Sequence, residues 1–162
     1  MKRRWGKVLW LGPLGLLAGL IAAALAAREP TERLTAANLA AARQRWTAAG
    51  LRDYSLDLDI GGTLYEVEVQ RGAVISLRVG GHAAASHDAQ SYSVDGWFST
   101  LELDLELAAD PHGPLAGGAE LLRVRFHPQL GYPERYVRAV SSAGRTQVVQ
   151  VRRLEPARGP PR

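Results

Sequence analysis

The sequence contains no cysteine among its 162 residues. Disulfide bonds, cysteine-ligated zinc, thiol catalysis and lipid attachment at an N-terminal cysteine are therefore excluded. Lysine is almost as scarce, because Lys2 and Lys7 are the only lysines among 20 basic residues. Arginine must therefore carry nearly all of the positive charge.

The formal net charge of +4 is concentrated at the N-terminus. Lys2, Arg3, Arg4 and Lys7 precede any acidic residue, and the remaining 16 basic residues face 16 acidic ones in the rest of the chain. A neutral domain lacks the basic surface that binds phosphate backbones. The sequence therefore predicts no nucleic-acid partner.

The segment Val8–Ala27 carries no charged residue. As a helix of about 1.5 Å per residue it would span roughly 30 Å, the thickness of bilayer hydrocarbon. The cationic residues before it should stay in the cytoplasm by the positive-inside bias. We therefore expect residues 1–27 to be a signal anchor that crosses the cytoplasmic membrane once through Val8–Ala27, oriented N-in and C-out.

A second interpretation of this segment is a cleaved signal peptide. Ala24-Leu25-Ala26 fits the small-residue pattern that signal peptidase recognises. Cleavage near Ala26 would release a secreted or periplasmic protein. Both interpretations place the rest of the chain outside the cytoplasm.

A short polar juncture at residues 28–34 precedes a segment whose apolar residues recur at helical spacing. The alanine-rich stretch 35–49 favours a helix and ends at Gly50, a natural C-cap. Apolar residues recur along one side of this helix, which predicts that the side faces a core. The stripe consists of Leu39, Ala42, Trp46 and Ala49.

Alternating apolar and polar residues then predict a three-stranded meander. The first strand is Tyr54–Ile60, and Gly61-Gly62 supplies a two-residue hairpin turn into a second strand that ends at Gln70. Arg71-Gly72 makes the next turn, and the third strand covers residues 74–79.

The remainder of the chain repeats this plan. Residues 80–92 are small and polar, which predicts a loop, and Ser93 is a candidate cap for the helix after it. Apolar residues at 94–108 recur at helical spacing, although residues 101–107 alternate as they would in a strand. We favour the helix, on which Glu102, Asp104 and Glu106 would form a solvated face. A breaker-rich loop at 110–118 precedes three further strands, at 122–126, 136–141 and 147–154, the last two joined by a turn at Ala143-Gly144.

The predicted fold is therefore α+β, an antiparallel sheet of about six strands in two helix-plus-meander halves. The domain covers residues 35–154, and the proline-containing tail 155–162 should be disordered. A duplication of the two halves is a hypothesis about architecture.

The charges of the predicted sheet are divided between its strands. The first two strands carry acids and the last three carry arginines, which favours cross-strand ion pairing, while the alternative is a bipolar surface that docks a charged partner or a second copy. The acids are Asp57, Asp59, Glu66 and Glu68, and the arginines are Arg123, Arg125, Arg135, Arg138, Arg145, Arg152 and Arg153.

Four sequence segments together resemble a known family. They are Trp46 with Tyr54 before a strand, VEVQRGAVISLRV at 67–79, SVDGWF at 93–98 and VRFHPQLGYPERY at 124–136. This order resembles a bacterial family of unknown function, the one catalogued under 6174, over nearly all of the predicted domain. The resemblance implies an exported or membrane-anchored protein and implies no activity.

The most specific part of that resemblance is Gly131-Tyr132-Pro133. We expect Gly131 to adopt a left-handed turn conformation, Tyr132 to pack over the turn and Pro133 to fix φ at the strand entrance. A ligand contact by Tyr132 is the alternative interpretation.

Catalytic and metal-binding patterns are not found in the sequence. The spacing of His82, His87, Asp88, His112 and His127 is unlike a metal-ligand motif. No G-x-S-x-G or S-x-x-K motif activates a serine, and no glycine loop placed to hold phosphate follows a strand. We therefore assign no catalytic, cofactor-binding or metal-ligating residue, and no cofactor.

The sequence thus predicts an extracytoplasmic, non-catalytic binding module. Its partners would be the membrane, through the N-terminal helix, and an unknown protein or envelope component, through a sheet face or an open edge. The alternative is an inhibitor or chaperone-like module that acts on an exported enzyme. A hydrolase is a third, less favoured interpretation.

Overall fold

The computed structural model describes residues 31–113, 115, 122–140 and 145–157. The predicted membrane segment and its cleavage site lie outside these residues, as do the turn at 143–144 and the last five residues of the tail. Among the residues that are described, no helix is long and apolar enough to cross a bilayer.

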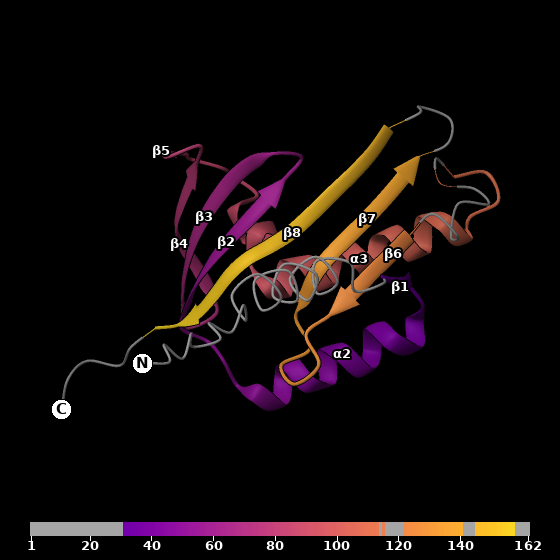
Figure 1. The fold of residues 1–162 in the computed structure, drawn as a ribbon, viewed down its shortest axis with the longest axis horizontal. Coiled ribbons are helices and arrows are strands. Elements are labelled where there is room, and N and C mark those ends of the chain that lie inside the picture. Colours follow the sequence, from indigo (N-terminus) through magenta and orange to yellow (C-terminus); the bar gives the residue numbers. More distant parts are fainter. Residues whose placement is uncertain (1–30, 114, 116–121, 141–144, 158–162) are drawn as a thin grey trace, which may run out of the picture. The chain divides into compact units, whose positions relative to one another are not determined.

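One antiparallel sheet of eight strands organises the described chain (Figure 1). Its spatial order is β1-β6-β7-β8-β2-β3-β4-β5, so β8 and β2 join the two halves of the sequence at the centre. The strands are β1 Glu32–Arg33, β2 Tyr54–Ile60, β3 Thr63–Gln70, β4 Ala73–Val79, β5 His82–Ala83, β6 Leu122–Phe126, β7 Pro133–Val140 and β8 Arg145–Pro156.

The six longer strands are those expected from the sequence, and the α+β prediction is confirmed. Two short strands, β1 and β5, were missed because they fall in the predicted juncture and loop. Each has only two residues and depends on pairing with a neighbour, β1 with β6 and β5 with β4. Two residues are too few to show an alternating pattern.

The strand ends also differ from the prediction at the C-terminus. Glu155 and Pro156 were assigned to a disordered tail, but they extend β8 and pair with Ser55 and Tyr54 of β2. Long-range pairing orders these residues, and their own composition gives no sign of it.

The first helix, α2, spans Ala36–Ala49, as predicted. Thr35 and Asn38 form a reciprocal capping box at its start, and Gly50 ends it with φ of 63°. Leu39, Ala42 and Trp46 are buried, but Ala49 is exposed, so the predicted stripe is one residue too long.

The second helix, α3, spans Val94–Ala109 and resolves the ambiguity at 101–107 in favour of helix. Ser93 caps it by accepting a hydrogen bond from the Gly96 N–H at 3.0 Å. A short 3-10 helix, η1, precedes it at Ala89–Tyr92, inside the segment predicted as loop.

The core lies between the two helices and one face of the sheet. Trp46 of α2 and Phe98 of α3 belong to the same buried cluster as Leu56, Leu58 and Val124 of the strands. Strand residues alternate between faces, so the intervening residues form the opposite face, which we call the open face. In Figure 1 the sheet passes in front of α3.

Candidate functional site

Ion pairs neutralise the part of the open face that spans β8, β2, β3 and β4. These pairs connect neighbouring strands, as the ion-pairing interpretation predicted. They are Arg153–Asp57 at 2.9 Å, Arg152–Asp59 at 2.7 Å and Arg78–Glu66 at 3.7 Å.

The electrostatics of these pairs agree with their geometry. The hydrogen bond from Arg152, followed by one from the Gly62 N–H, lowers the pKa of the Asp59 carboxyl. The hydrogen bond to Asp57 raises the pKa of Arg153. Asp57, Asp59 and Glu66 are thus matched by arginines of the same protein, whereas Glu68 is exposed and has no described arginine partner.

The opposite end of the open face is different. Arg33 of β1 lies directly across from Arg123 of β6, and Arg125 of β6 lies directly across from Arg135 of β7. We call these four residues the arginine ladder. Like charges in cross-strand register are unfavourable unless other groups compensate for them.

Only one of these arginines has a described acidic partner. Arg125 donates to Glu134 at 2.9 Å, and Arg123 donates to the hydroxyl and carbonyl oxygens of Thr31. Within the residues that the structure describes, the guanidinium groups of Arg33 and Arg135 have no hydrogen-bonding or acidic partner. The ladder therefore retains a surplus of positive charge.

Two further arginines of the predicted charge division are placed elsewhere. Arg138 lies on the core side of β7 and reaches α3, which corrects its assignment to the polar face. The side chain of Arg145 lies outside the described residues.

Asp104 contradicts the prediction of a solvated acidic face on α3. It is buried, its side chain only 3% exposed, and it accepts from the Tyr136 hydroxyl at 2.6 Å and from Arg138 at 2.7 Å. Burial of the hydroxyl raises the pKa of Tyr136, and the hydrogen bond to Asp104 raises it further. Both donors come from β7, so the cluster fastens α3 to the sheet.

The two acids flanking Asp104 differ from it. Glu102 forms an ion pair with Arg43 of α2, and Glu106 is exposed. Glu102 and Glu106 line one cavity between α2 and α3, together with Leu39 and Leu105.

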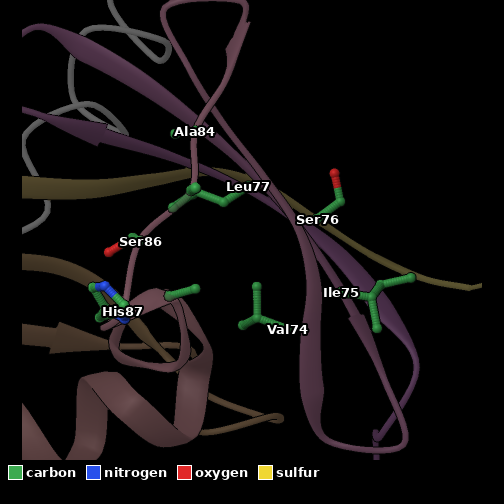
Figure 2. A pocket seen from close by; sticks show the side chains of 9 residues that line it. Val74, Ile75, Ser76, Leu77, Ala84, Ser86 and His87 are labelled. Carbon is green, nitrogen blue, oxygen red and sulfur yellow. The ribbon is translucent and has the colours of Figure 1, made fainter.

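A cavity of about 270 Å³ lies beside the outer edge of β4 (Figure 2). Figure 2 shows Val74 and Leu77 pointing toward the segment that carries His87, whereas Ile75 points to the other side of the strand. A register shift in the β3–β4 pairing accounts for this departure from simple alternation. Ile75 is 53% exposed.

Side-chain hydrogen bonds protect the edge of β4 on one side of this cavity. Gln90 accepts from the Val74 N–H at 3.1 Å and donates to the Gly72 carbonyl at 3.0 Å, taking the place of a neighbouring strand. On the other side the Ala84 N–H donates to the Leu77 carbonyl at 2.9 Å. The unpaired edge is therefore limited to a short stretch around Ile75.

The histidines considered from the sequence are dispersed. His82 lies in β5, His87 lines the cavity with Asp88 after it, and His112 lies in the turn after α3. His127 accepts from the Leu130 N–H at 3.0 Å. The described part of the chain contains no group of three histidine or acidic residues that could hold a metal ion.

The Gly131-Tyr132-Pro133 turn has the predicted structure. Gly131 has φ of 80°, and a Cβ there would lie 2.2 Å from the Ala42 carbonyl oxygen. Tyr132 stacks on His127 with ring centroids 4.8 Å apart, and Pro133 begins β7. These contacts give the turn a structural role.

Comparisons with known proteins give no relative for this chain. No family model, no curated protein and no solved structure matches it. The candidate site therefore depends on its own geometry, and the arginine ladder is its most distinctive feature. Sequence reasoning missed Arg33, because only the β1–β6 pairing places it beside Arg123.

Proposed function

We propose that this protein is a non-catalytic binding module, held outside the cytoplasm, that docks an anionic envelope partner on the arginine ladder. The observation that carries the proposal is the cross-strand register of Arg33 with Arg123 and of Arg125 with Arg135. The Arg33–Arg123 pair has no described acidic partner and opposes folding, and Arg135 adds a further charge beside the compensated Arg125, so an anionic partner would relieve the remaining repulsion.

The charge distribution favours an anionic partner over a second copy. Self-docking would need a free acidic surface to meet the ladder. Asp57, Asp59 and Glu66 are already paired with arginines of their own sheet, which leaves only Glu68 of the four acids in the predicted charge division. The positive surplus is therefore better matched by a different molecule.

The location rests on the sequence. The uncharged segment Val8–Ala27 with basic residues before it supports export or anchoring, and the resemblance to the family catalogued under 6174 supports the same location. Membership of that family is part of the proposal.

A pull-down from crosslinked membranes tests the proposed function. The wild-type protein should recover an envelope partner, and R33Q/R135Q should not, because it removes the two arginines that have no described partner. R52Q/R71Q is the matched control, since it removes the same charge from two exposed residues outside the ladder. Recovery of the wild-type protein with neither a crosslinked protein nor a crosslinked lipid would contradict the proposal.

The cavity at the β4 edge favours a second candidate function. The cavity beside the small side chains of Ala84, Ala85 and Ser86 could receive an apolar side chain of an exported enzyme, as an inhibitor or chaperone-like module would, and exposed Ile75 adds apolar surface at the same edge. Under this alternative, I75D alters the regulation of an envelope protease and R33Q/R135Q does not.

A further inference from the structure

We infer that the anionic partner of the ladder is the phosphate-bearing headgroup layer of the membrane itself. This inference rests on the proposed function and names its partner. The open face would lie against the outer leaflet of the cytoplasmic membrane, with the ladder contacting acidic phospholipids.

Chain length is the first argument. Arg33 follows Ala27, the last residue of the predicted span, by six positions. At about 3.3 Å per residue, even a fully extended connection allows roughly 20 Å between them. If the span is not cleaved, Arg33 must stay close to the membrane surface.

Strand pairing extends this proximity to the whole ladder. Arg123 is the register partner of Arg33, and Arg125 and Arg135 lie on β6 and the next strand, β7. Neighbouring strands are about 4.8 Å apart, so the ladder extends only about 10 Å across the sheet from β1 to β7. All four arginines thus lie at the end of the open face that is joined most directly to the span.

The chemistry of the side chains fits phosphate. Guanidinium groups present paired N–H donors that match phosphate oxygens, and they are less strongly hydrated than ammonium groups. The ladder contains only arginine. Its surplus charge also suits a surface of many weak phosphate sites better than a single deep pocket.

Energy transfer from the protein to labelled lipids tests this inference on the full-length chain. Since the protein has no cysteine, one introduced cysteine carries the donor dye without background. Q150C places the dye on the open face, because Gln150 is the register partner of Arg135. T47C places it on the exposed side of α2 as a reference.

The anchored protein is compared in lipid discs of zwitterionic lipid and of lipid containing acidic phospholipid. Transfer from Q150C should rise with acidic lipid and fall again at high salt, whereas transfer from T47C should not rise. Each arginine near an anionic surface strengthens binding about fivefold, so R33Q/R135Q should reduce the docking constant about thirtyfold. R52Q/R71Q should leave it nearly unchanged.

Three results would overturn the inference: equal transfer from Q150C in both lipids, a rise that R33Q/R135Q does not reduce, or an equal loss in R52Q/R71Q. If the lipids have no effect but the pull-down recovers a protein that R33Q/R135Q loses, the lipid inference fails and the proposed function stands. If neither experiment responds to R33Q/R135Q, both fail.

Discussion

Removing the buried carboxylate of Asp104 should be the most damaging polar substitution in the described domain. In the wild type, the Tyr136 hydroxyl and the Arg138 guanidinium donate to the Asp104 carboxylate at 2.6 and 2.7 Å, and D104A removes this acceptor from both. The helix–sheet contact then contains donors that water cannot easily reach. The variant should still fold, with reduced stability.

The magnitude follows from the exposure of the two partners. Breaking a buried ion pair from one side typically costs about 3–5 kcal/mol. Arg138 is 33% exposed, so water recovers part of its solvation and the lower end applies. We expect D104A to lower the free energy of unfolding by about 3 kcal/mol, and Y136F, which removes one hydrogen bond, by about 1 kcal/mol.

Urea unfolding followed by tryptophan fluorescence measures this effect, because Trp46 and Trp97 are both in the core. A loss of about 3 kcal/mol corresponds to a midpoint lower by about 2 M for an ordinary denaturant dependence. The triple variant D104L/Y136F/R138M, which replaces the cluster with apolar groups, should recover most of the loss. A cost below about 1 kcal/mol for D104A would refute the reasoning.

Three further substitutions test other parts of the structure. G131A should destabilise the protein by more than about 2 kcal/mol in a thermal melt, because its new Cβ would meet the Ala42 carbonyl. Burial raises the pKa of Tyr54 from its usual value near 10 to about 12. The free energy of unfolding that the neutral phenol contributes below pH 10 should therefore be lost as the pH rises toward 12, and Y54F should lose less stability over this range. Q90A should expose the Val74 N–H and produce concentration-dependent oligomers in size-exclusion chromatography.

Each of these predictions has its own control or refuting result. G80A has a positive φ but nothing within 4 Å of its added Cβ, so it should cost only about 1 kcal/mol, and equal costs for the two glycines would contradict the packing argument. Equal alkaline sensitivity of the wild type and Y54F would contradict the effect assigned to Tyr54. A monomeric Q90A at every concentration would show that the edge needs no protection.

The sequence predicted the elements that have strong local signals. Alternation identified β2, the glycine pair Gly61-Gly62 identified its hairpin, and Gly50 and Ser93 marked helix ends through their capping chemistry. These signals act over a few residues and do not depend on the rest of the fold.

Features created by distant pairing could not be predicted. Asp104 has the same alternating context as Glu102 and Glu106, and only β7 supplies its two donors. Arg33 lies in a polar juncture until β1 pairs with β6. Both cases depend on residues about 30 or more positions apart, beyond the range of periodicity or propensity.

The central claim is that the open face, at the arginine ladder, contacts the partner. A photo-crosslinking residue at Val137, which lies between Arg123 and Val148 in register, tests this most directly in living cells. The same residue at Thr47 on α2 gives the comparison. We predict crosslinks to an anionic envelope component from position 137 that are lost in R33Q/R135Q; crosslinks from position 47 alone would contradict the account.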